Sequence, residues 1–327
     1  MSQAVMDVEP RPAVFLRLAW TKLEARMLLL TIGIAIVMTF ISPYFLTAGN
    51  LLNLLDQSIG VSIIAIGMTF VILTGGIDLS VGSLVGMTGV IFGMSLQHVG
   101  VPTAALLAIS AGAFTGLISG ILITRFHMAA FVVTLGVMSI GRSLAYILSG
   151  ANAITNIPPS LGEFAYSQVL GIRVNVWVVV ILYLAAWLYL KYTKGGRTIY
   201  AIGSNVEAAR TAGLRVVFYS IIPYVISGAL SAVAIILMTA QLLTVDPLAG
   251  TSMELDAIAP VVIGGASLYG GRGSIIGTLL GVAIMVMIKN GLNLLQVSPF
   301  WQGSAIGTII IVAVLAGSVL GRRNSRG

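Results

Sequence analysis

The chain has 327 residues, of which 58% are hydrophobic and 8% are charged, and its formal net charge is +7. A soluble domain carries about a quarter charged residues, so this composition excludes a water-soluble globular protein and indicates an integral membrane protein. The absence of cysteine excludes disulfides, thiolate metal sites and a cysteine nucleophile, and two histidines argue against a histidine-based metal site.

The apolar runs predict an all-α, polytopic membrane protein. Runs of about 20 residues span the hydrocarbon layer as helices, and these runs are continuous, whereas those of a barrel alternate. We expect a segment 1–26, a membrane domain 27–320 and a tail 321–327. About ten spans, some short or broken, are predicted in chain order at 27–46, 58–74, 81–96, 103–124, 128–149, 174–190, 217–243, 257–269, 274–296 and 303–320.

The loop charges predict the orientation of these spans. If the N-terminus is cytoplasmic, all but three of the 17 basic residues fall on the cytoplasmic side, the exceptions being Arg142, Arg173 and Lys289. This bias is the one expected of cytoplasmic loops. It places both termini in the cytoplasm and the loops at 150–173 and 246–256 outside. The positive charge therefore reflects membrane orientation, and we expect no nucleic-acid binding. A topology with eight spans, in which short pieces are merged, would not keep the basic residues on one side, so it is the second choice.

The longest regular polar stretch, 194–216, predicts a short cytoplasmic helix. Ser204 and Glu207 have the spacing of a capping box, and Gly213 suits the left-handed residue that ends a helix. About eight helical residues lie between these ends, and so short a helix is marginal by itself in water. It therefore requires a surface on which to dock.

A few polar residues interrupt the apolar runs. Asp78 lies in a glycine-flanked break, where it is either a gate or pathway residue or, with Ser80, a cap for the next helix; the cap is the favoured interpretation. The residues Lys289, Asn290 and Asn293 would be costly against lipid. We expect them to face other helices or a water-filled path.

No Walker A motif occurs in the chain, because no glycine-rich turn coincides with Gly-Lys-Ser/Thr. Energy from ATP must therefore come from another polypeptide. No relay of acidic residues and histidines threads the spans, which argues against a proton-driven pump.

Four motifs carry a resemblance to a known family. They are LTGGIDLSVGS at 73–83, GRTIYAIGSNVEAARTAG at 196–213, GGASLYGGRG at 264–273 with GT at 277–278, and NGLNLL at 290–295. With them, the chain resembles the permease subunits of bacterial ABC importers, in particular the ribose/galactose/xylose-type sugar permeases, over about 50–320. Ser204 stands where that family usually has glycine.

The resemblance implies a non-catalytic inner-membrane subunit that imports a monosaccharide and needs no cofactor. The implied partners are a cytoplasmic ABC ATPase subunit, a periplasmic solute-binding protein and a second permease chain, identical or different. In such permeases a cytoplasmic helix like 205–212 inserts into a groove of the ATPase. The residues that would carry this coupling are Ser204, Asn205, Glu207, Ala208, Ala209, Arg210 and Gly213.

Alternatives remain open at this point. An importer of the same superfamily for nucleosides, branched amino acids or a furanose signal would have a nearly identical sequence pattern. A secondary transporter belongs to a different class, and the lack of ion-site carboxylates disfavours it.

Overall fold

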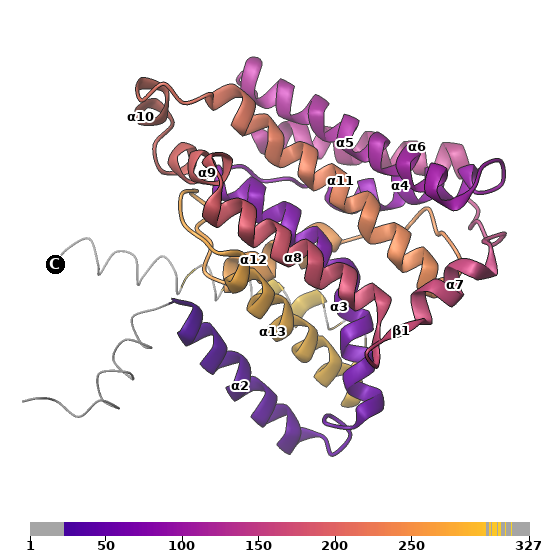
Figure 1. Ribbon diagram of the computed structural model, residues 1–327. Helices are drawn as coiled ribbons and strands as arrows, with labels where there is room; N and C mark the ends of the chain where they lie inside the picture. Colours follow the sequence, from indigo (N-terminus) through magenta and orange to yellow (C-terminus); the bar gives the residue numbers. More distant parts are fainter. Residues whose placement is uncertain are drawn as a thin grey trace, which may run out of the picture.

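The computed structural model describes residues 23–298 and the isolated positions 301, 303–305, 307, 308, 311 and 315. Within these residues the chain is a bundle of helices with one small hairpin (Figure 1). The predictions for residues 1–22, for most of the span at 303–320 and for the tail 321–327 lie outside the described residues.

The elements follow the predicted order. The first half contains α2 (Leu23–Ile41), α3 (Ala48–Leu73), α4 (Val81–Ser95), α5 (Val101–Arg125), α6 (Ala130–Ser149) and α7 (Pro159–Tyr166). The second half contains β1 (Gln168–Val169), β2 (Ile172–Arg173), α8 (Val174–Tyr192), α9 (Lys194–Ser204), α10 (Val206–Thr211), α11 (Val216–Leu242), α12 (Met253–Ile263) and α13 (Ile275–Leu294).

Seven of the described helices are long and apolar enough to cross a membrane: α2, α3, α5, α6, α8, α11 and α13. Helices α4 and α12 are shorter, with 15 and 11 residues. They lie at the predicted spans 81–96 and 257–269. The helical fold class is confirmed. The total of about ten spans and the cytoplasmic position of both termini stay predictions.

Helix α3 begins ten residues before the predicted span at 58–74. Thr47 caps it, since its hydroxyl oxygen accepts a hydrogen bond from the amide of Asn50. In the additional helical residues 48–57, the polar side chains of Asn50 and Asp56 have partners on other elements. The helix ends at Leu73, after which Gly75 adopts a φ of +82°.

The external loop predicted at 150–173 contains secondary structure. It holds α7 and the antiparallel pair β1–β2, in which Gln168 lies opposite Arg173 and Val169 opposite Ile172. Leu170 and Gly171 form the two-residue connection with φ of 56° and 76°. Positive φ at both positions is typical of a type I′ hairpin turn.

The centre of the bundle is α11, which packs against α5, α3 and α4 (Figure 1). Glycines bring the backbones of α5 and α11 into contact: a Cβ on Gly228 would lie 2.1 Å from the carbonyl oxygen of Gly112. A Cβ on Gly116 would lie 2.1 Å from the carbonyl oxygen of Tyr224. Small residues of this kind allow close helix packing where lipid offers no hydrophobic driving force.

The bundle has two distinct ends. At the α10 end, the last turn of α3 meets α9 and the loop before α13, and the amide of Gly271 donates to the carbonyl of Leu73 at 3.0 Å. At the opposite end, which we call the hairpin end, β2 reaches the beginning of α3, and α7 reaches the end of α11.

We predict that Gly228→Val separates α5 from α11 and destabilises the protein. Overpacking of this kind costs about 1–3 kcal/mol, and no side chain can rotate away because the obstacle is backbone. The matched control is Gly136→Val in α6, where an added Cβ meets nothing within 4 Å. Thermal unfolding of the detergent-purified variants measures the difference. Equal melting temperatures for the two variants would contradict the packing argument.

Candidate functional site

Helix α9 is fixed to the ends of the membrane helices. Thr193 caps its start by accepting a hydrogen bond from the amide of Gly196 at 3.0 Å. At its other end, Gly203 lies so close to α3 that a Cβ would come within 1.9 Å of the Leu73 carbonyl oxygen. Only glycine permits this approach. The end of α9 and the end of α3 therefore lie backbone against backbone.

Tyr200 ties α9 to a third element. Its hydroxyl donates a hydrogen bond to the carbonyl of Gly273, in the loop before α13, at 2.9 Å. Burial, together with the nearby Glu24 carboxylate, raises the pKa of this hydroxyl. The hydroxyl therefore stays protonated and remains a donor.

Helix α10 projects from the bundle next to α9 (Figure 1). Its residues are exposed apart from Ala209. Glu207 and Arg210 form an exposed ion pair of 2.9 Å along one side of the helix. Such a pair contributes little stability when solvated, but it presents an ordered pattern of charge to a partner.

The start of α10 differs from the predicted capping box. The cap is Asn205, whose side-chain oxygen accepts from the amide of Ala208 at 2.9 Å. Ser204 is the last residue of α9, and its hydroxyl donates to the carbonyl of Tyr200. Glu207 pairs with Arg210 and not with the cap. The assignment of Ser204 as the cap was wrong, because the polar stretch forms two helices and Ser204 is the last residue of the first.

The end of α10 is the predicted one. Gly213 has a φ of +75°, its amide donates to the carbonyl of Arg210, and the amide of Leu214 donates to the carbonyl of Ala209. These two bonds define a Schellman motif. An added Cβ on Gly213 would meet nothing within 4 Å, so the backbone conformation alone requires glycine. Capped at both ends, α10 is a rigid unit of six residues.

The break between α3 and α4 is a buried polar junction. Asp78 is 1% exposed, and one of its oxygens accepts from both the amide and the hydroxyl of Ser80. The other oxygen accepts from the hydroxyl of Ser227, on α11, at 2.8 Å. Buried polar groups are satisfied by such bonds, so Asp78 joins the start of α4 to α11. Ser80 is the N-cap residue of α4 but its side chain makes no capping hydrogen bond, so the favoured interpretation of Asp78 and Ser80 as a side-chain cap was wrong. Its role as a gate residue stays a prediction.

The three polar residues predicted on α13 point to different partners. Lys289 pairs with Asp256 of α12 at 2.7 Å. Asn290 exchanges two side-chain hydrogen bonds with Asn50 of α3, at 2.8 and 3.0 Å, and Asn293 is exposed near the end of the helix. The expectation that they face other helices holds for Lys289 and Asn290. A role of these side chains in a translocation path stays a prediction.

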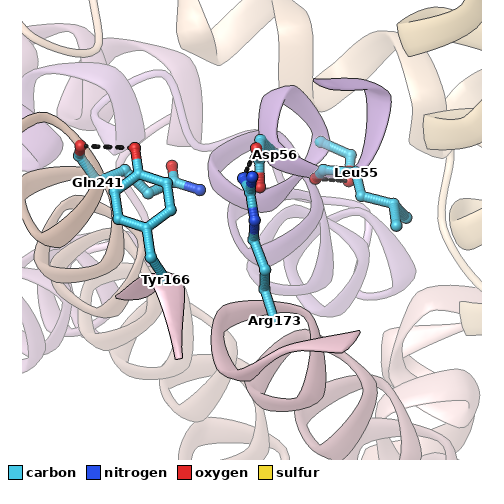
Figure 2. Close-up of polar contacts among 6 residues, drawn as sticks. Leu55, Asp56, Tyr166, Arg173 and Gln241 are labelled. Carbon is cyan, nitrogen blue, oxygen red and sulfur yellow. Dashed lines mark hydrogen bonds and ion pairs between the residues drawn. The ribbon is translucent and has the colours of Figure 1, made fainter. Parts of the chain in front are cut away.

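The hairpin end contains an ion pair that crosses between elements, as Figure 2 shows. Arg173 of β2 pairs with Asp56 of α3, and its guanidinium lies 5.0 Å from the ring centroid of Tyr166. The Tyr166 hydroxyl donates to the carbonyl of Gln241, near the end of α11. One arginine thus links α3, α7 and the hairpin, and the tyrosine beside it extends the link to α11.

Arg142 also has a structural role that the sequence did not reveal. Its guanidinium, on α6, donates to the carbonyl oxygens of Pro247 and Ala249 at 2.9 and 3.0 Å. It therefore holds the loop between α11 and α12.

The polar residues that pair across the bundle were not predicted from the sequence. Asn50 and Asp56 belong to a mixed polar and apolar stretch, and Ser227 lies within an apolar run, so nothing in the local sequence marks these residues as partners of distant side chains. Asn50 and Asn290 are 240 residues apart, and no local pattern pairs them.

Comparison with known protein families gives one match across most of the chain. The matching family is described as the permease component of the branched-chain amino acid transport system, and it covers residues 50–315. No solved structure matches the chain.

Curated proteins similar to this chain include three sugar permeases. A ribose import permease of Escherichia coli (strain K12) is 41% identical over 91% of this chain and 94% of its own length. The ribose import permease of Bacillus subtilis (strain 168) is 43% identical over 86% of this chain and 88% of its own length. A D-allose transport system permease of Escherichia coli (strain K12) is 35% identical over 94% of each.

We predict that Ser227→Ala weakens the junction at Asp78. The substitution removes the donor to one carboxylate oxygen, and an unsatisfied buried acceptor costs about 1–3 kcal/mol. The control is Ser231→Ala, one turn along α11, whose buried hydroxyl donates only to the Ser227 carbonyl of its own helix. Melting temperatures of the purified variants measure the effect, and a Ser231→Ala protein as unstable as Ser227→Ala would refute it.

Proposed function

The chain belongs to the family of branched-chain amino acid transport system permease components, and on that premise we propose what this member transports and how it is driven. It is the permease subunit of an ABC importer for a sugar, and it is a multi-pass protein of the inner membrane. The solute that we propose is a monosaccharide of the ribose type.

The observation that carries this function is similarity over almost the whole length. Relatives named for ribose or D-allose transport align with 86–94% of this chain at 35–43% identity. The described part of the chain contains seven helices of spanning length.

A second candidate solute is a branched-chain amino acid, which the description of the family names. The relatives favour the sugar, because those named for a substrate are named for ribose or allose. A secondary transporter is the rival from another class.

Membership of this family implies an ATPase partner and a solute-binding protein. We propose that α10 is the element that the ATPase contacts, because it is exposed, capped at both ends and ordered by an ion pair. The α10 end would face the cytoplasm. The basic residues Arg125, Lys194, Arg197 and Arg215 gather there, as expected for a cytoplasmic face.

Movement of α10 would reach the membrane helices by two routes. One passes through α9 to Leu73 and Gly273, at the ends of α3 and α13. The other passes directly into α11, which begins five residues after α10 ends. Since Ser227 of α11 holds Asp78, the second route also reaches the break between α3 and α4. Two copies of the chain, moved together, would alternate between inward-facing and outward-facing states.

The function is tested by uptake into proteoliposomes that contain this chain, its ATPase and its solute-binding protein. Uptake of radiolabelled ribose that requires ATP and the binding protein is the expected result. Uptake of leucine in place of ribose would favour the second candidate. Uptake that survives ATP depletion and collapses with the ion gradient would identify a secondary transporter.

If α10 couples the ATPase to the membrane helices, substitutions of the adjacent residues Ser204 and Asn205 should affect uptake differently. Asn205→Ala removes the side-chain cap of α10, worth about 1 kcal/mol, and should lower ATP-driven uptake about fivefold if helix order is limiting. Ser204→Ala removes only a hydroxyl that donates within α9, and should transport normally. Membrane insertion of both variants is checked by their abundance in washed membranes. Equal uptake by the two variants would argue against the capped helix as the coupling element.

The charges of α10 provide a stronger perturbation of the same element. Reversal of the pair, with Glu207→Arg and Arg210→Glu together, preserves the internal ion pair but inverts the pattern presented to the ATPase. We expect uptake to be abolished while insertion is unchanged. Normal uptake by this variant would exclude recognition through these charges.

A further inference from the structure

A groove with two chemically different parts lies beside α10. It has a volume of about 640 Å³ and lies where the end of α5 meets the beginning of α11. Three arginines line it: Arg125 of α5, Arg210 of α10 and Arg215, which immediately precedes α11. The apolar wall includes Ile121, Phe218 and Ile221, and Phe218 is 54% exposed.

The two parts of the groove are arranged along the membrane normal. Helices α5 and α11 are antiparallel, since Gly112 meets Gly228 and Gly120 meets Ile221. Both helices are of spanning length. Arg125 is the last residue of α5 and Arg215 immediately precedes α11, so their guanidinium groups lie at the level where the membrane helices end. The apolar wall extends from there along the spans.

The charge of the groove is not neutralised within the described chain. Among residues 23–298, Arg125 and Arg215 form no ion pair, and Arg210 pairs with Glu207 through one nitrogen. No acidic residue lines the groove. Guanidinium groups bind phosphate through two parallel hydrogen bonds, so the rim has the composition of a phosphate site.

We propose that this groove binds an anionic phospholipid. The headgroup phosphate lies against Arg125, Arg210 and Arg215, and an acyl chain follows the apolar wall between α5 and α11. Basic pockets between membrane helices on the cytoplasmic side suit such headgroups. A soluble phosphate compound would contact only the arginines, whereas a membrane lipid contacts the arginines with its headgroup and the apolar wall with its acyl chain.

The site has a consequence for regulation that rests on the proposed function. Arg210 belongs to the helix assigned to coupling, so a bound headgroup contacts α10 beside the Glu207–Arg210 pair. The lipid then restrains the movement of α10 relative to α5, and ATP-driven transport depends on the content of anionic lipid.

Lipid retention by the purified permease, without ATPase or sugar, tests the binding. The chain is equilibrated in detergent with dioleoyl phosphatidylglycerol or dioleoyl phosphatidylcholine, and bound lipid is counted by native mass spectrometry. We expect one phosphatidylglycerol per chain to be retained in preference to phosphatidylcholine. The double variant Arg125→Gln/Arg215→Gln should bind it about thirtyfold more weakly, as expected on removal of two cations that each contribute about 1 kcal/mol near a headgroup. Arg272→Gln, which removes an exposed cation at the same end but outside the groove, should bind normally.

Further measurements separate the alternatives. Dihexanoyl phosphatidylglycerol has the same headgroup but short chains, and it should bind much more weakly if the apolar wall contributes. Equal retention of phosphatidylglycerol by the wild type and the double variant, or of both lipids by the wild type, would overturn the proposal. Displacement of the lipid by millimolar inorganic phosphate would reassign the site to a free anion. Unchanged lipid binding together with loss of ATPase binding by the double variant would make the groove a protein-docking surface. Melting temperatures without lipid confirm that the variants are folded, and failure of sugar uptake leaves these results untouched.

Discussion

The buried carboxylate of Asp78 imposes the constraint on which the centre of this molecule depends. A carboxylate removed from water is costly unless hydrogen bonds surround it, and here the donors come from two places. Ser80 supplies two of them at the start of α4, and Ser227 supplies the third from α11. The break between α3 and α4 and the middle of α11 therefore have to stay in register, because separating them would leave one carboxylate oxygen without the Ser227 donor.

The helices around this junction are held by backbone contacts as much as by side chains. Glycines bring α5 against α11, and Gly203 brings α9 against the end of α3. The capped α10 is attached to this rigid frame through α9 and α11. The same element that is exposed for a partner is thus connected to the core by short paths, and this connection is the structural basis of the proposed coupling.

The sequence predicted the features that depend only on neighbouring residues. The apolar runs gave the long helices, and Gly213 gave the end of α10, because a left-handed residue is a property of one position. The choice between Ser204 and Asn205 as the cap was not local: both residue types can cap, and α9 extends through Ser204 while its last turn packs on α3. Polar partners such as Asn50 with Asn290, or Asp56 with Arg173, depend on contacts between distant segments. For the same reason the sequence marked Asp78 as exceptional but did not reveal its bond to α11.

The ion pair at the hairpin end differs in mechanical character from the contacts at the α10 end. Gly203 and Leu73 touch through backbone atoms, which no rotamer change relieves, so this joint is stiff. Arg173 reaches Asp56 and Tyr166 with a long side chain that has several rotatable bonds, so this joint is compliant. A displacement applied at α10 is therefore passed on with little loss where it enters the bundle. At the far end the rotatable bonds of Arg173 let the hairpin shift relative to α3 while the ion pair stays formed.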